Sequence, residues 1–159
     1  MIVVSDTTPI NYLVLIDHID VLPALFGRVL VPPAVLNELR HPGSPGKVRS
    51  WARPPPAWLE MRRPSHLDDT IHLGRGEIEA ISLAQELGAA QVLIDDMQAR
   101  KAALARGLRV AGTLLVLDRA ARRRLLDLPE ALSRLAHTNF RAPTALVEYL
   151  LRKDAARRP

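Results

Sequence analysis

Residues 74–96 read GRGEIEAISLAQELGAAQVLIDD, a stretch in which a helical pattern passes directly into a strand pattern. Residues 76–87 favour a helix, and Gly88 is placed to end it in the left-handed conformation. The apolar run 91–94 predicts a short buried strand, and it delivers two adjacent acids at 95–96. A helix, a glycine cap and a strand that ends in carboxylates are typical of one unit of an α/β protein.

The N-terminus carries the same pattern. Ile2–Val4 is a β-branched strand pattern, Asp6 follows it, and Thr7, Thr8 and Pro9 begin a helix. Alternation of short strands and helices predicts a mainly parallel sheet with helices on both faces. Ligands of such sheets bind beyond the carboxyl ends of the strands. Further helices are expected over 9–16, 21–26, 33–40, 96–105, 112–124, 129–136 and 142–152, and further strands over 28–31 and 108–110.

Composition excludes several classes of protein. The chain of 159 residues contains no cysteine, so disulfides, iron–sulfur clusters and thiolate zinc sites are excluded. No apolar stretch is long enough for a membrane span, and no basic segment precedes the first apolar run. We expect a cytoplasmic protein with one domain over residues 1–159.

The net charge is +5, and part of the basic excess is clustered. Arginine and lysine gather at 62–63, at 119–124 and at 152–158. A polyanionic partner would explain these clusters through phosphate contacts, and solvated helix faces would explain them equally well. Charge alone leaves both interpretations open.

Glu77 is the acid whose position is most informative. On a helical wheel Ala80, Ile81 and Ala84 lie within about 60° of Glu77, in the middle of the apolar stripe. Glu79 lies on the other side and is expected to face water. A carboxylate directed at a protein core must be paired or bind a metal. The alternative, that Glu77 only complements the helix dipole, applies equally to Glu79.

The other candidate acids have simple structural alternatives. Asp6, Asp95 and Asp96 each precede a predicted helix, where aspartate often caps the first turn. Glu38 shares a helix face with Ala34 and could instead pair with a neighbouring arginine. The coincidence of Asp6 and Asp95 at one end of the sheet favours a common site.

Together, these acids would form a pocket that contains only oxygen ligands. Such ligands favour Mg²⁺ or Mn²⁺, and the five histidines show no zinc-binding spacing. A divalent ion held by carboxylates beside a basic surface is suited to phosphodiester hydrolysis, because it can activate a water and stabilise the leaving oxygen. No phosphate-binding loop, dinucleotide fingerprint or nucleophile elbow is present.

The order of these motifs resembles that of the PIN domain family, as found in VapC-type toxins and related predicted nucleic-acid-binding proteins. The similar segments cover most of residues 1–120 and read VVSDTTPINYL, VLVPPAVLNELR, GRGEIEAISLAQELGAAQVLIDD and ARGLRVAGTLLVL. The resemblance implies a three-layer α/β/α sandwich with a short-stranded parallel sheet. Residues from about 125 to 159 resemble the family less, and we expect them to form a helical extension of the same domain.

The resemblance also implies a site and partners. The catalytic acids would be Asp6, Glu38, Glu77 and Asp95, and the metal ligands would be Asp6, Glu77, Asp95 and, as an accessory, Asp96. Either Thr7 or Thr8 would be the small hydroxyl residue near the metal. Glu77 stands where the family usually has aspartate, so its side chain is one methylene longer. The implied activity is that of a Mg²⁺- or Mn²⁺-dependent endoribonuclease acting on RNA, as the toxin of a toxin–antitoxin pair. A homodimer and a cognate antitoxin are the expected protein partners.

Two other classes of function remain open from the residues. Asp6-Thr7-Thr8 after a strand also resembles a phosphatase of the haloacid-dehalogenase type, in which Asp6 would be the nucleophile. That interpretation gives Glu77 no reason to face inward. A non-catalytic PIN-like nucleic-acid or protein binder would keep the fold and the basic face without needing a metal.

Overall fold

The computed structural model describes all residues from 1 to 159, and its centre is a five-stranded parallel sheet in the order β3-β2-β1-β4-β5. Every neighbouring pair of strands is parallel, as the alternation of strands and helices predicts. The strands are β1 (Val3–Ser5), β2 (Val29–Val31), β3 (Leu59–Met61), β4 (Gln91–Leu93) and β5 (Val110–Ala111).

Nine helices connect and flank these strands. Four of them begin within four residues after a strand, so their N-termini lie toward the carboxyl edge of the sheet. The helices are α1 (Thr7–Leu15), α2 (Val21–Phe26), α3 (Pro33–Arg40), α4 (Gly46–Trp51), α5 (Arg75–Leu87), α6 (Met97–Ala105), α7 (Thr113–Arg122), α8 (Leu128–Ala136) and α9 (Thr144–Arg157).

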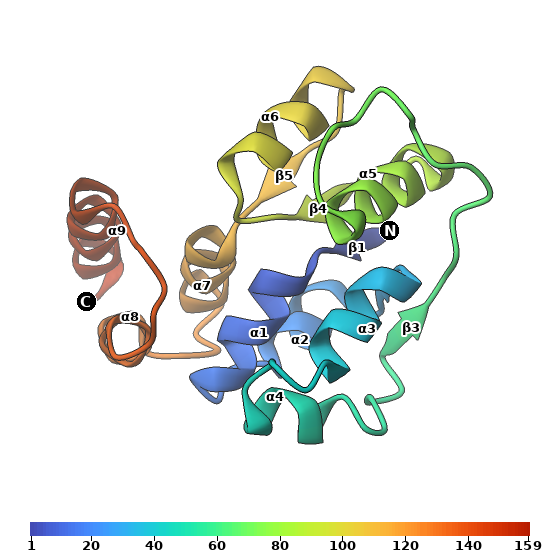
Figure 1. Cartoon of the computed structure of the whole chain (residues 1–159). Helices are drawn as coiled ribbons and strands as arrows, with labels where there is room; N and C mark the ends of the chain where they lie inside the picture. The colour runs from blue at the N-terminus through green and yellow to red at the C-terminus, as the bar shows by residue number, and fades with distance from the viewer.

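The helices lie in two layers, with the sheet between them (Figure 1). Successive strand residues point to opposite faces, so Val3 packs in one core and Val4 in the other. The larger core joins the sheet to α1, α2, α4 and α7, and the smaller one joins it to α5 and α6. The expected α/β/α fold with a parallel short-stranded sheet is confirmed.

Most predicted elements lie within two or three residues of the observed ones. Gly88 ends α5 with φ 59° and ψ 47°, the left-handed conformation that the sequence predicts for this cap. Strand β3 was not predicted, because it is a half-exposed edge strand within a proline-rich segment. Its backbone nevertheless pairs with β2, where Leu59 lies beside Val29.

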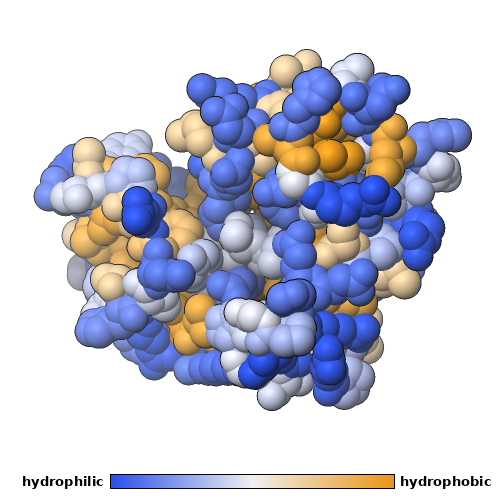
Figure 2. Space-filling model, in the orientation of Figure 1, coloured by the Kyte–Doolittle hydropathy of each residue, from blue (hydrophilic) through white to orange (hydrophobic).

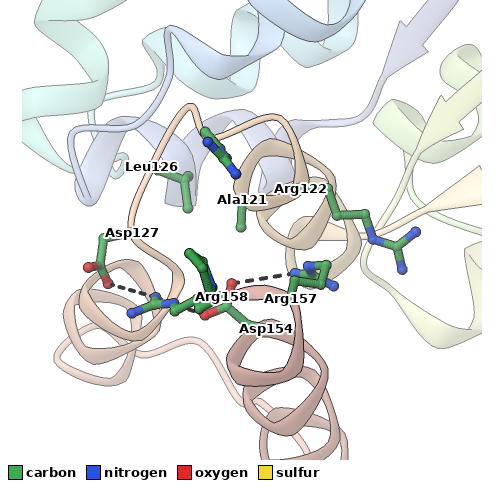
Figure 3. A pocket seen from close by; sticks show the side chains of 9 residues that line it. Ala121, Arg122, Leu126, Asp127, Asp154, Arg157 and Arg158 are labelled. Atoms are coloured by element: carbon green, nitrogen blue, oxygen red, sulfur yellow. Dashed lines mark hydrogen bonds and ion pairs between the residues drawn. The ribbon is translucent and has the colours of Figure 1, made fainter.

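The C-terminal helices α8 and α9 pack against the larger core through Leu128, Leu135 and Leu150. Asp118 of α7 is 1% exposed and pairs with Arg157 of α9 at 3.0 Å. Figure 3 shows this region, where Asp154 lies between Arg157 and Arg158. The ion pairs therefore fasten the end of α9 to α7.

One further property concerns the membrane. None of the helices combines the length and the apolar character that a membrane span requires.

Candidate active site

Asp6 occupies the end of β1 at the centre of the sheet. Its backbone is extended, and its amide donates to the Leu93 carbonyl at 2.9 Å, which joins it to β4. Asp6 stands at the cap position of α1, but its carboxylate makes no capping hydrogen bond. The residue is 3% exposed. The carboxylate is therefore buried and does not cap the first turn of α1.

The charge environment of Asp6 identifies its neighbours. The pKa of Asp6 is raised to about 7, with burial as the largest cause, and a hydrogen bond from the backbone amide of Thr7 opposes the rise. The negative charges of Glu77, Glu38 and Asp95 contribute to the same rise. Charges act in this way only over short distances. The structure thus brings the four acids together, although they come from four separate elements of the chain.

Glu38 reaches the site from α3. Its side chain accepts a hydrogen bond from the Thr7 hydroxyl, which directly follows Asp6. A Cβ atom placed on Gly76 would lie 2.6 Å from Glu38 Oε1, so the absence of a side chain at this position of α5 leaves room for the carboxylate. Thr7 and Gly76 together fix where the Glu38 carboxylate lies.

Glu77 lies in the first turn of α5 and is half-buried. A Cβ atom placed on Gly74 would lie 2.6 Å from Glu77 Oε2, so a second glycine makes room for a second acid. The charge of Glu77 is the largest of the three carboxylate contributions to the pKa of Asp6. Its direction toward the site agrees with the helical wheel.

The wheel was wrong about Glu79, which does not face water. Glu79 is 5% exposed; its Oε1 accepts from the Ala34 amide at 3.0 Å, and its Oε2 accepts from Arg75 at 2.6 Å. The wheel assumed one buried face, but α5 packs against both the sheet and α3. Glu79 therefore joins the first turn of α3 to α5 and is a structural carboxylate.

Asp95 is held by Thr113, the first residue of α7. Its Oδ1 accepts from the Thr113 amide at 2.7 Å, and its Oδ2 accepts from the Thr113 hydroxyl at 2.7 Å. A Cβ atom on Gly112 would lie 2.8 Å from Asp95 Oδ1 and 3.5 Å from Arg100 Nη1, which places that cation beside Asp95. Sequence reasoning did not assign Thr113, although Gly112-Thr113 follows a strand in the same manner as Asp6-Thr7.

Asp96 has a different place from its neighbour. Its Oδ2 accepts from the Ala99 amide at 2.9 Å, and it is the N-cap of α6. It is exposed and is not among the charges that raise the pKa of Asp6. Capping, the simple alternative, accounts for Asp96 in this structure, and its role as an accessory metal ligand stays a prediction.

Tyr12 adds an aromatic edge to the site. Burial, followed by the negative charge of Asp95, raises the pKa of the Tyr12 phenol. The phenol donates to Asn139 Oδ1 at 2.8 Å, and the ring packs edge-on against Phe140. The segment between α8 and α9 therefore contacts the margin of the acidic centre.

The donor set suits a hard divalent cation. No three histidine or carboxylate side chains converge closely enough to ligate one ion directly. Mg²⁺ binds proteins through one or two carboxylates and keeps several of its waters, so an open set of separated carboxylates fits a hydrated ion. The presence of three further carboxylates near buried Asp6 is the observation that favours a cation here. Asp6, Glu77 and Asp95 are the candidate ligands, and in this arrangement no more than two of them would contact the ion directly.

Comparison with known proteins gives one match. The family model of the PIN domain matches residues 2–155, which include all the candidate acids, α8 and most of α9. No significant match was found among curated proteins or among solved structures. The family match gives no support to the haloacid-dehalogenase alternative. Because the match extends over nearly the whole sequence, the chain belongs to the PIN domain family.

Proposed function

We propose that this protein is a divalent-metal-dependent ribonuclease that hydrolyses phosphodiester bonds at the acidic centre around Asp6. PIN domains are generally nucleases. The observation that carries the proposal is the burial of Asp6 near three further carboxylates, at a cap position where its own side chain does not cap the helix. Such a group is costly in a folded protein unless a cation compensates it.

The acids and threonines of the acidic centre would have separate roles in the reaction. Asp6, Glu77 and Asp95 would hold Mg²⁺ or Mn²⁺, which when bound supplies charge neutralisation and an activated water. Thr7 orients Glu38, and Thr113 orients both oxygens of Asp95. Glu38 is exposed and hydrogen-bonded at one oxygen, so its other oxygen is available to accept a proton from an attacking water.

The test is cleavage of labelled single-stranded RNA by the purified chain with Mn²⁺, with Mg²⁺ and with a chelator. We expect cleavage that requires metal and that Asp6→Asn abolishes. Cleavage by Asp6→Asn at the full rate would refute the site. A chain that binds RNA but neither cleaves it nor binds Mn²⁺ in calorimetry would instead be a non-catalytic binder.

The proposal extends to the cellular setting of the enzyme. We propose a toxin of a toxin–antitoxin pair that acts on cytoplasmic RNA as a homodimer and is inhibited by a cognate antitoxin. The resemblance of the sequence motifs to those of VapC-type toxins supports this proposal. Expression of the wild-type chain in bacteria should arrest growth, whereas expression of Asp6→Asn should not. Growth at equal rates with both would remove the toxin role.

A further inference from the structure

Three arginines converge on a surface pocket between the end of α3 and α4. The pocket has a volume of about 480 Å³, and Pro42 contributes the one apolar side chain in its wall. We call it the arginine pocket; its lining residues are Arg40, Pro42, Arg49, Ser50 and Arg53. It is separate from the acidic centre, because none of the candidate acids lines it.

Backbone carbonyls hold each guanidinium in place. Arg40 Nε donates to the Ala52 carbonyl at 2.9 Å, and Arg49 Nη1 donates to the Pro42 carbonyl at 2.6 Å. Arg53 Nη2 donates to the Arg40 carbonyl at 2.8 Å. A guanidinium has five N–H donors, so most donors of each arginine remain free. The three cations are oriented before any ligand arrives.

No carboxylate neutralises these arginines. None of the three takes part in an ion pair, and the sequence between Glu38 and Glu60 contains no acid. The pocket in Figure 3 is the contrasting case, because Asp154 and Asp127 pair with its arginines. Positive charge that is oriented but unpaired is suited to an anion, and guanidinium groups match phosphate oxygens in pairs.

The position of the pocket indicates which anion it takes. Arg40 ends α3, the helix that carries Glu38 into the acidic centre. Figure 2 shows hydrophilic residues along the lower edge of the molecule, where Figure 1 places α4. We propose that the arginine pocket binds a backbone phosphate of the RNA strand, away from the bond that is cut. This inference rests on the proposed ribonuclease function, for which it supplies a substrate contact.

The proposal is tested by RNA binding in chelator, where cleavage cannot occur. The double variant Arg49→Gln/Arg53→Gln is compared with Arg123→Gln/Arg124→Gln, which removes the same charge at the exposed end of α7. Affinity for a short labelled single-stranded RNA is measured over a series of salt concentrations. We expect the pocket variant to bind about tenfold more weakly, with a salt slope smaller by about one, and the control to change by less than about twofold.

The outcomes separate the pocket from the nuclease. Equal losses in both double variants would mean that only the overall charge matters, and unchanged binding in both would mean that RNA avoids the pocket; either result overturns the inference. A wild-type chain that fails to bind RNA overturns it as well. Metal-dependent cleavage by the wild-type chain is scored separately, so the proposed function can survive any of these results.

A second measurement needs no variant and so does not depend on folding of a mutant. The wild-type chain is treated with a dicarbonyl reagent that modifies arginine, with and without RNA, and the modified sites are located by mass spectrometry. RNA should protect Arg49 and Arg53 and leave Arg123 and Arg124 as reactive as before. Equal reactivity of Arg49 and Arg53 in both samples would contradict the proposal.

Discussion

At the residue scale, the acidic centre depends on small neighbours as much as on the acids themselves. Gly74, Gly76 and Gly112 each leave space that a carboxylate fills, so a methyl group at any of them would meet an acid within 3 Å. Thr7 and Thr113 then hold two of the acids by hydrogen bonds. The threonine hydroxyls and the glycines thus position the carboxylates so that a cation can bind near them.

Asp6 should make the metal-free protein less stable as pH rises. Its folded pKa of about 7 exceeds the ordinary value of 3.8, so the folded chain keeps a proton that the unfolded chain releases. The cost is absent below the ordinary pKa, grows as pH rises toward 7 and is complete above it. Asp6→Asn in chelator should therefore raise the melting temperature at about pH 8 and change it little at about pH 4.

The matched control for that measurement is Asp69→Asn, because Asp69 is exposed and lies outside the acidic centre. Thermal unfolding is followed by circular dichroism in both buffers. Added Mn²⁺ should reduce the difference in melting temperature between the wild-type chain and Asp6→Asn. A lower melting temperature for Asp6→Asn at about pH 8 would show that burial of this carboxylate carries no folding cost.

Gly76→Ala should reduce activity without a loss of stability. The new methyl group would meet the end of the exposed Glu38 side chain, which can move aside at little cost. Alanine also favours a helix over glycine by about 1 kcal/mol. We expect RNA cleavage to fall about tenfold, as it does when a residue that orients a metal site is lost, with an unchanged or higher melting temperature.

The mechanism of that loss can be checked with a double mutant. If Gly76→Ala acts by displacing Glu38, adding it to Glu38→Gln should cause little further loss, because both changes remove the same carboxylate from its place. Additive losses would mean that Gly76 serves the site in another way.

At the element scale, α5 shows what the sequence could predict and what it could not. The wheel placed Glu77 correctly, because the sheet-facing stripe of α5 has a clear apolar period. It misplaced Glu79 and missed the burial of Ser82, because α3 and the segment before α5 cover further sides of the helix. Contacts between helices that are distant in the sequence produce no periodic pattern in either helix. The strand ends at Asp6 and Asp95 could be predicted from local apolar patterns. The hydrogen bond from Thr113 to Asp95 could not, because its two residues lie in distant segments.

Glu77→Ala should therefore lower the cleavage rate and not the stability, whereas Glu79→Ala should lower the stability. Glu77→Ala should lower cleavage about tenfold or more, since it removes an expected metal ligand, and should leave stability unchanged or higher. Glu79→Ala leaves the Ala34 amide without its acceptor and should lower the free energy of unfolding by about 1–3 kcal/mol. Denaturation curves and single-turnover cleavage rates measure the two effects. Equal losses of activity in correctly folded variants would contradict this assignment of roles.

The start of α6 allows a separate test of Asp96. Asp96→Ala removes a capping bond and should cost about 1 kcal/mol, whereas Asp96→Asn should keep the cap and cost much less. Chemical denaturation of the three chains measures the difference. Because Asp96→Asn changes the charge alone, its Mn²⁺ affinity in calorimetry then tests the accessory-ligand prediction. An equal loss of stability in both variants would show that the charge matters rather than the cap.

At the scale of the whole molecule, the C-terminal helices join the same core as the sheet, although the sequence resemblance was weaker after about residue 125. Leu128 and Leu150 belong to the cluster that contains Val3 and Leu93. The segment between α8 and α9 contacts Tyr12 beside the acidic centre. The extension therefore supports the margin of the site. We expect residues 1–159 to unfold as one cooperative unit.

Arg157→Gln tests that expectation. Asp118 is 1% exposed, and the loss of Arg157 would leave it with Arg122 as its only cationic partner. We expect the free energy of unfolding to fall by about 1–3 kcal/mol. This is less than for a buried carboxylate that loses its only cationic partner, because Arg122 remains. The double variant Arg157→Gln/Asp118→Asn should recover part of it, because the buried charge that needed Arg157 is gone. If α8 and α9 fold with the sheet, the whole melting curve should shift as one transition. A second, earlier transition in calorimetry would instead show that the C-terminal helices unfold independently of the sheet.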